Sequence, residues 1–270
     1  MSDHHLDIQK AHWDALASAV DDDIAMNHWI DEAGEPVDVE MFTQIARYLK
    51  AEFLDGEKEG RVLEVGCGNG LILKELQAIL SDNWMLDGAD VSNEMLKRIQ
   101  NDNISVMCCD ARDVPHADSQ YDLIYLHSVV QYFEGEAYLR SVIDECCRLL
   151  KRGGHLCIMD VPFVWYREFM TRNDMVARIK KLVKRRMKYK FVRDIYGLLK
   201  GRSGTRMAKE VIGGQSILLP AIKGYYADPD IFYNYDERFR RISIEVQPFS
   251  RKPLIYRRFR FNIMMRNLVE

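Results

Sequence analysis

The chain has 270 residues, 47% of them hydrophobic, so it can bury a full core and its composition excludes a disordered protein. No apolar run reaches the roughly 18 residues of a membrane span, and the first residues lack the basic start and apolar centre of a signal peptide. The six cysteines show no CxxC spacing, which argues against a zinc site or a disulfide framework, and no metal is expected. We therefore expect a soluble, cytoplasmic protein.

The net charge of −3 conceals two segments of opposite charge. Residues 1–60 hold 15 acidic and 4 basic residues, whereas residues 172–211 hold 3 acidic and 14 basic residues. This separation predicts a charged partner, pairing between the two segments, or both.

The predicted elements begin with the acidic residues 1–60, which are expected to be helical, most clearly over 9–20 and 37–54. From Arg61 to Asp160, strand-length apolar runs alternate with amphipathic stretches, the pattern of βαβ units in a parallel sheet. The expected strands lie at 61–65, 84–90, 104–109, 121–126 and 154–160. Helices are expected over 71–80, over 93–100, and from Glu136 to a stop at Gly153 and Gly154.

An irregular stretch is expected over 161–235, followed by two β-rich runs, 241–247 and 254–265, that would add a hairpin to the sheet edge. Within that stretch, apolar residues recur every three or four positions from Val176 to Leu198, which predicts an amphipathic helix with a basic opposite face. The expected parts of this single domain are a helical N-terminal extension (1–60), an α/β core (61–162), a helical lid insertion (163–235) and a C-terminal hairpin (236–270).

The most informative motif is the glycine-rich turn "EVGCGNG", residues 64–70, after the first predicted strand. Glycines let a ligand approach the backbone closely because no Cβ intervenes. A dinucleotide fingerprint needs a third glycine where this chain has Leu71, which argues against a nicotinamide-dependent oxidoreductase. Glu64 beside the turn would repel a pyrophosphate, but it suits a ligand with an ammonium or sulfonium group.

Two aspartates end the next two predicted strands, Asp90 and Asp110. Ligands of doubly wound sheets lie at the carboxyl ends of the strands, so both acids are expected in one crevice with the glycine turn. Asp90 is placed to accept hydrogen bonds from ribose hydroxyls, and Asp110 is placed to accept one from the exocyclic amino group of a purine.

Four stretches between residues 62 and 162, taken in order, resemble the class I S-adenosylmethionine-dependent methyltransferases: "VLEVGCGNG", "GADVSNEML", "CDARDVPHADSQYDLIYLHSVVQYF" and "RLLKRGGHLCIMDVP". The resemblance implies a Rossmann-like, mostly parallel sheet of seven strands with an antiparallel last strand and helices on both faces. It also implies the cofactor S-adenosyl-L-methionine, with S-adenosyl-L-homocysteine as its product.

The same resemblance implies a role for each matching residue. Glu64, Gly66, Cys67 and Gly68 would lie at the amino-acid end of the cofactor, Asp90 and Val91 at its ribose, Met95 on the adenine face, Asp110 and Ala111 at the adenine edge, and Leu126 and His127 near the sulfonium. The family often has a histidine where this chain has Gln131, so that position is not assigned as a base.

His127 is the first candidate base, because it follows the fourth strand and a histidine titrates near neutrality. Its alternative role is hydrogen bonding to cofactor or backbone. Asp160, which ends the fifth strand, is the second candidate, with a cap or turn as the alternative. His12 and Trp13 resemble a helix that closes over the cofactor in some family members, with plain packing as the alternative. Four tyrosines are expected either to line an acceptor pocket or to pack in the core, namely Tyr225, Tyr226, Tyr233 and Tyr235.

These motifs predict a methyltransferase acting on a small-molecule or saccharide acceptor, with oxygen favoured because "LHSVVQY" replaces an Asn-Pro-Pro-Tyr-like motif. The alternatives are a regulatory or scaffold protein that binds the cofactor without activity, and a methyltransferase of lipid-linked substrates at a membrane surface. Residues 172–211 would then meet an anionic membrane or a phosphorylated substrate, and the alternative is a basic face that only meets solvent. No nucleic-acid-binding module is recognised, so nucleic acid is not an expected partner, and a homo-oligomer stays open.

Overall fold

The computed structural model describes residues 4–19, 39–162, 207–212, 215–220, 225–233, 239–246 and 260–267. The predicted basic helix over 176–198 and Tyr235 lie outside the described residues, as does the side chain of Tyr233. Within the described part, no helix has the length and apolar character needed to cross a membrane.

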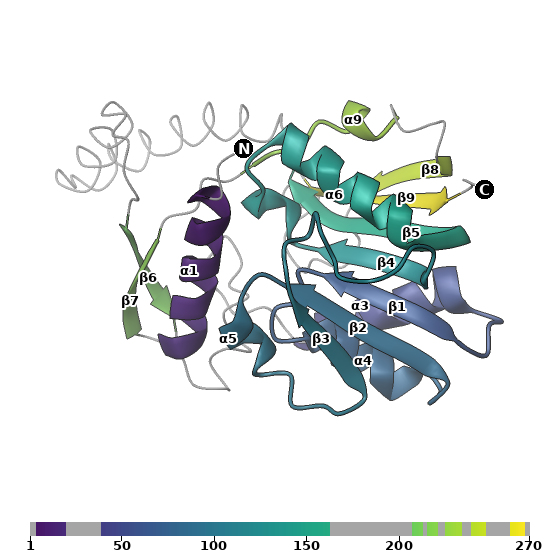
Figure 1. The fold of residues 1–270 in the computed structure, drawn as a ribbon, viewed down its shortest axis with the longest axis horizontal. Coiled ribbons are helices and arrows are strands. Elements are labelled where there is room, and N and C mark those ends of the chain that lie inside the picture. The colour runs from purple at the N-terminus through teal and green to yellow at the C-terminus, as the bar shows by residue number, and fades with distance from the viewer. Residues whose placement is uncertain are drawn as a thin grey trace, which may run out of the picture.

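A seven-stranded sheet forms the centre of the described structure, in the order β3-β2-β1-β4-β5-β9-β8 (Figure 1). The strands are β1 Gly60–Val65, β2 Trp84–Asp90, β3 Ile104–Cys108, β4 Tyr121–His127, β5 Leu150–Pro162, β8 Phe239–Val246 and β9 Arg260–Asn267. Strands β1 to β5 pair in parallel, and β9 runs antiparallel to both of its neighbours. The expected Rossmann-like sheet with an antiparallel last strand is confirmed.

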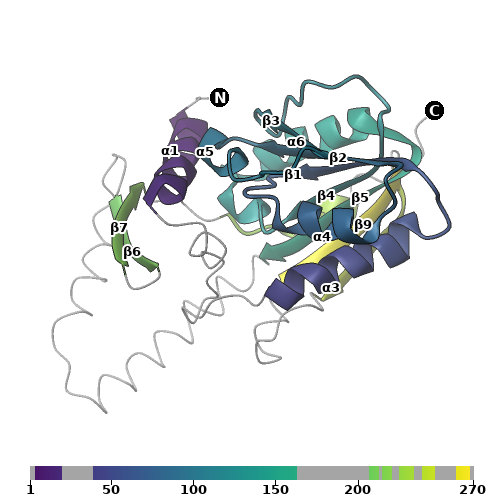
Figure 2. The same cartoon turned by 90° about the horizontal axis from the view of Figure 1, so that it is seen from below.

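The helices are α1 His4–Ala19, α3 Val39–Leu49 with a π-helical turn Lys50–Leu54, α4 Leu71–Ile79, α5 Asn93–Leu96, α6 Glu136–Leu149 and α9 Asp230–Tyr233. Helices α3 and α4 cover one face of the sheet and α6 and α9 the other, while α1 lies off the end of the sheet (Figures 1 and 2). Strand β4 shows how the faces are divided: Leu123 and Tyr125 pack into the core beside α3 and α4, while Ile124 and Leu126 pack beside α6 and α9. Because side chains of a strand alternate between faces, both hydrophobic layers are encoded in one short apolar run.

The predicted end of the long helix is wrong. Helix α6 ends at Leu149, and β5 begins directly at Leu150, four residues before the predicted strand. Gly153 has a φ of 82°, and a Cβ on Gly154 would lie 3.0 Å from the carbonyl oxygens of Lys151 and Tyr121. The register between β4 and β5 shifts here. The two glycines therefore serve a strand irregularity and not a helix cap.

A second difference lies in the stretch expected to be helical or irregular over 161–235. Two strands, β6 Met207–Ile212 and β7 Gln215–Pro220, form a separate antiparallel hairpin there. Strand β7 lies against α1, away from the main sheet (Figures 1 and 2). Alternation within such short segments is weak, so the sequence did not reveal this hairpin.

Candidate functional site

A pocket lies at the carboxyl ends of β1, β2 and β4, roofed by residues of α1. From β1, successive strands are added on one side as β2 and β3 and on the other side as β4 and β5. The topological switch point therefore lies between β1 and β4, and ligands of open α/β sheets bind at such a point. The lining residues are Leu6, Gln9, Trp13, Gly66, Gly68, Asn69, Ala89, Asp90, Val91, Met95, Cys109, Ala111, His127, Ser128, Val129, Tyr132, Phe133 and Tyr138.

The glycine turn contributes to this pocket in two ways. Gly66 has a φ of 76°, and a Cβ there would lie 2.5 Å from a methyl carbon of Val129, so this glycine permits close packing of the loop that follows β4. Gly68 also has a positive φ, 52°, but a Cβ there would meet nothing within 4 Å. Gly68 thus presents bare backbone to open space, as a ligand cradle requires.

Asp90 fixes the turn from the end of β2. Its carboxylate accepts hydrogen bonds from the backbone N–H of Gly68 and from that of Ser92, each at 2.8 Å. Burial raises the pKa of Asp90, although these two hydrogen bonds oppose the shift. A carboxylate offers about four acceptor sites, so Asp90 retains capacity for ligand hydroxyls in the pocket that it lines.

Helix α1 is joined to the loop after β4. The side chains of His5 and Gln9 both hydrogen-bond the carbonyl oxygen of Tyr132, the former at 3.0 Å. The ring of Trp13 meets the Tyr132 ring edge to face, with centroids 4.9 Å apart. His12 is buried and contacts Trp13. The helix thus packs over the pocket with aromatic contacts.

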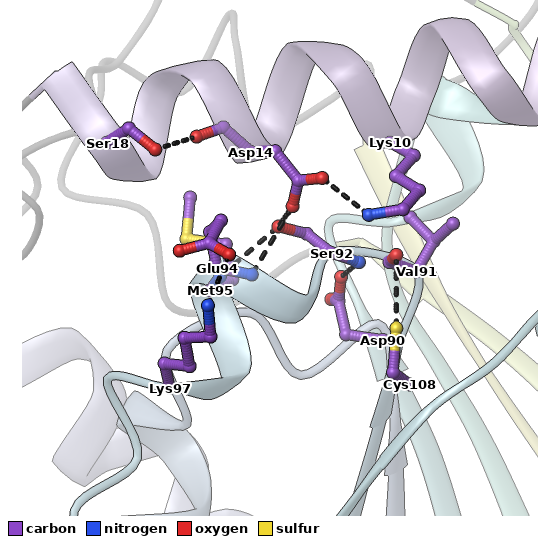
Figure 3. A network of polar contacts seen from close by, with 10 residues as sticks. All are labelled: Lys10, Asp14, Ser18, Asp90, Val91, Ser92, Glu94, Met95, Lys97 and Cys108. Carbon is purple, nitrogen blue, oxygen red and sulfur yellow. Dashed lines mark hydrogen bonds and ion pairs between the residues drawn. The ribbon is translucent and has the colours of Figure 1, made fainter.

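The opposite side of α1 is joined to α5 through Asp14 (Figure 3). One Asp14 oxygen accepts a hydrogen bond from the Ser92 hydroxyl at 2.6 Å and one from the Glu94 N–H at 3.3 Å, and the other accepts from Lys10 at 2.5 Å. The buried Ser92 is also the N-cap of α5, accepting from the Met95 N–H at 3.2 Å. Ser92 therefore links Asp14 on the roof to Asp90 beneath it.

Asp14→Ala is expected to loosen α1, because it removes hydrogen bonds to a charged group, each worth about 1.5–3 kcal/mol. Hydrogen exchange of the α1 amides should speed up roughly tenfold or more, measured by mass spectrometry at neutral pH. Asp7→Ala, an exposed aspartate on the same helix, is the matched control. Equal exchange in both variants would contradict the role given to Asp14.

The pH dependence of this contact follows from the pKa of Asp14. Burial alone would raise that pKa, but hydrogen bonds from Lys10, Ser92 and the Glu94 amide outweigh burial and lower it below 3.8. The stabilisation that ionised Asp14 gives to the folded protein is therefore complete above pH 3.8 and is lost as the pH falls through the lowered pKa of Asp14.

Glu64 lies beneath the turn and outside the lining of the pocket. Its side chain is on the α4 side of β1 and accepts a hydrogen bond from the Tyr125 hydroxyl at 3.0 Å. Burial raises the pKa of Glu64 well above 4.5, and the charge of Asp90 adds to the shift. Any effect of this acid on a cationic ligand therefore acts through the loop and not by direct contact.

Glu64→Gln is expected to raise the thermal midpoint. As pH rises above 4.5, the unfolded chain loses the Glu64 proton before the folded chain does, so the wild-type protein loses stability with rising pH. Glutamine has no such proton and can still accept the Tyr125 hydrogen bond. Thermal melts from acidic to neutral pH should show an advantage that grows with pH, with exposed Glu57→Gln as control. A constant or shrinking advantage would refute this.

Asp110 supports the pocket wall rather than lining it. Its carboxylate accepts hydrogen bonds from Arg112 and, at 2.8 Å, from the hydroxyl of Tyr138, whose ring lines the pocket beside Ala111. Burial would raise the pKa of Asp110, but the hydrogen bonds from Arg112 and Tyr138 lower it. Asp110 thereby fixes Tyr138 and Arg112 against each other.

The two candidate bases differ in their access to the pocket. His127 ends β4 and lines the pocket, with 3% of its surface exposed. Asp160 does not line it; its carboxylate accepts a hydrogen bond from Ser128, which does. Leu126 faces the opposite core beside α6. A further histidine, His155 of β5, packs against Phe53 outside the pocket lining, and burial lowers the pKa of His155.

Of the remaining predicted residues, some line the pocket and others do not. Val91 and Met95 line the pocket, whereas Cys67 fills the space beneath Gly88. Tyr225 is half-buried, and its N–H donates to the Gln131 carbonyl at 2.8 Å, outside the pocket lining.

Several lining residues were not predicted from the sequence. On α1 these are Leu6 and Gln9, which lie seven and four positions before Trp13 and so share one helix face with it. Trp13 itself was expected on a helix that closes over the cofactor. Ser128, Val129, Tyr132, Phe133 and Tyr138 follow β4, where no periodic pattern distinguishes lining from packing residues.

Residues 63–158 match the methyltransferase-domain family, from β1 to β5 and across the pocket. The chain contains a methyltransferase domain. The resemblance to class I S-adenosylmethionine-dependent methyltransferases is thus confirmed at the level of the family. The basic segment and the C-terminal hairpin lie beyond the matched residues.

Individual relatives of this methyltransferase domain are proteins of different kinds. The chain is 30% identical over 122 residues to a probable tRNA methyltransferase 9B of Mus musculus, covering 45% of this chain and 25% of that protein. It is 34% identical over 106 residues to the chondramide synthase cmdD of Chondromyces crocatus, covering 37% of this chain and 3% of that protein. The chain thus spans a quarter or less of the length of these relatives.

One solved structure is similar in fold to nearly the whole chain, beyond the methyltransferase domain alone. A geranyl diphosphate C-methyltransferase from Streptomyces coelicolor A3(2), solved with Mg²⁺, geranyl diphosphate and S-adenosyl-L-homocysteine, has a TM-score of 0.58. The similarity covers 99% of both chains at 14% identity, so it concerns the fold alone.

Proposed function

We propose that this protein is an S-adenosylmethionine-dependent methyltransferase. The observation that carries the proposal is the pocket at the β1–β4 switch point, built mainly from the matched domain, where Gly68 offers bare backbone and Asp90 offers a half-buried carboxylate. This donor set suits an adenosyl amino acid, because hydroxyls can bind the acid and a carboxylate or amine can approach the turn. When bound, the cofactor supplies an activated methyl group.

The residues that would hold the cofactor follow from this geometry. In the proposal, Gly66 and Gly68 contact its amino-acid end, Asp90 and Val91 its ribose, and Met95 and Ala111 its adenine. Glu64, Cys67, Asp110 and Leu126 act indirectly, by fixing the loop and the walls. His127 is the proposed base at the methyl-transfer end.

For the acceptor, we propose a small molecule or a saccharide, methylated at oxygen. Four aromatic side chains line the pocket, Trp13, Tyr132, Phe133 and Tyr138, and such a lining suits a compact acceptor that displaces water. The mouse relative is a probable tRNA methyltransferase, so transfer to RNA is an outcome that the experiment must distinguish.

The insertion over 163–235 is the proposed acceptor-side lid. Its described hairpin lies against α1, the helix that roofs the pocket, which supports a shared role. Of the basic segment 172–211, only the first residues of β6 are described, so its proposed contact with a phosphorylated substrate or an anionic membrane rests on charge.

The test combines binding with product detection. Calorimetry should show S-adenosyl-L-homocysteine binding more tightly than NAD. Incubation with methyl-¹³C-labelled S-adenosylmethionine and cell extract, separated into small-molecule, lipid and RNA fractions, should place the label in the small-molecule fraction. Label in RNA or lipid would overturn the acceptor class. Binding without label in any fraction would favour the non-catalytic alternative, and failure to bind would overturn the cofactor assignment.

A further inference from the structure

A polar pair, Ser128 directly after β4 and Asp160 among the last residues of β5, lies at the methyl-transfer side of the proposed cofactor site. His127 of β4 pairs with Met159 of β5, so the next residues, Ser128 and Asp160, are neighbours across the two strands. The Ser128 N–H donates to the Met159 carbonyl at 3.1 Å, and the Ser128 hydroxyl donates to the Asp160 carboxylate. Ser128 lines the pocket and is 4% exposed, while Asp160 lies behind it.

The direction of this hydrogen bond determines what Ser128 offers to a ligand. An ionised carboxylate only accepts hydrogen bonds, and a serine hydroxyl has a single proton. Because that proton is directed to Asp160, the oxygen of Ser128 can present only lone pairs to the pocket. A ligand group that hydrogen-bonds this oxygen must therefore be a donor.

The pair is held in an unfavourable backbone conformation. Ser128 has a φ of 55° and Asp160 a φ of 58°, and both lie in the left-handed region that serine seldom adopts. The N–H of Asp160 donates at 3.0 Å to the side-chain oxygen of Asn262, a fully buried residue of β9, which fixes the conformation from the far side. Residues held in this way persist when the surrounding structure over-determines them, and they concentrate at functional sites.

The strand order separates this pair from the ribose end of the pocket. Asp90 ends β2 and Ser128 follows β4, and these strands lie on opposite sides of β1 and its glycine turn. A cofactor whose ribose lies at Asp90 therefore extends across the turn toward β4. Ser128 then faces the transferred methyl group and the acceptor.

We propose that Ser128 selects methyl acceptors that carry a hydrogen-bond donor, a hydroxyl or an amine, and that Asp160 is the positioning residue that directs the serine proton away from the pocket. This inference rests on the proposed function and deepens it by assigning acceptor recognition. Carbon and thioether acceptors, which have no proton to donate, are disfavoured by the same geometry.

The test uses two small probes that differ by one methyl group, phenol, which donates a hydrogen bond, and its methyl ether anisole, which only accepts one. Their binding to the protein saturated with S-adenosyl-L-homocysteine is measured by ligand-observed NMR. Wild-type protein should prefer phenol about fivefold, the ratio expected from one net hydrogen bond. Ser128→Ala should abolish the preference, with Ser141→Ala, a half-buried serine of α6 outside the pocket lining, as the matched control.

Two further variants keep the test decisive. Asp160→Asn tolerates the left-handed backbone but carries donors of its own, so Ser128 can direct its proton to the pocket and the preference should shrink. Ser128→Gly relieves the backbone and should lose the preference without losing thermal stability. Equal binding of phenol and anisole to wild type, or a preference that survives in Ser128→Ala and Ser128→Gly, would overturn the proposal. Failure of wild type to bind S-adenosyl-L-homocysteine would instead overturn the proposed function.

Discussion

His127→Ala is expected to reduce methyl transfer by about 10²- to 10⁴-fold, the usual contribution of a positioned general base. His127 directly follows the apolar core of β4, lines the pocket and has almost no contact with bulk water. Its loss should leave the binding of S-adenosyl-L-homocysteine much less changed, because removal of a proton matters only in the transition state. The measurement is the rate of ¹³C-methyl incorporation into the labelled product, together with calorimetric affinity for S-adenosyl-L-homocysteine.

His155→Ala supplies the control for this experiment. His155 is also on a central strand and half-buried, but it packs against Phe53 outside the pocket lining. Its replacement should leave the rate within a fewfold of wild type. Should His127→Ala weaken cofactor affinity more than it slows transfer, His127 would be a binding residue and the base assignment would fall.

Asp90→Ala is expected to weaken S-adenosyl-L-homocysteine binding roughly 10- to 150-fold, because a hydrogen bond to a charged group contributes about 1.5–3 kcal/mol. Two effects combine. The ligand hydroxyls lose the Asp90 carboxylate as hydrogen-bond acceptor, and the backbone N–H groups of Gly68 and Ser92 lose the same acceptor. Isothermal calorimetry gives the affinity, and thermal melts give the cost to the fold.

Two companion variants separate these effects. Asp90→Asn keeps one acceptor oxygen for the turn, so its melting temperature should fall less than that of Asp90→Ala, while its affinity still drops. Asp102→Ala, at an exposed turn before β3, should change neither quantity. An unchanged dissociation constant in Asp90→Ala would remove this residue from the site.

The central strands were predictable because their signal is local. The predicted bounds of β2, 84–90, are those observed, and β1 and β4 differ by one residue at an end. The boundary between α6 and β5 was missed because Gly153 and Gly154 fit both a helix stop and a strand irregularity. Only the pairing with β4 decides between these roles, and that pairing joins residues about 30 positions apart.

The sequence likewise predicted only part of the candidate site. Glu64 was expected to line the ligand site from its distance to the glycine turn, but it alternates with Val65 and so faces α4. Asp110 was expected at the adenine edge, but Arg112 and Tyr138 occupy its oxygens. Ser128 carried no sequence signal, because its role depends on Asp160 of a neighbouring strand.

The sequence by itself determined the order of strands and helices from β1 to β5, the glycine turn, the acid at the end of β2 and the family, because each rests on short-range spacing and side-chain type. The tertiary structure decided which of those side chains reach the pocket, the roof that α1 forms over it through Trp13 and Asp14, and the direction in which Ser128 donates its proton. These features depend on contacts between residues far apart in the chain, and such contacts exist only once the two faces of the sheet are packed.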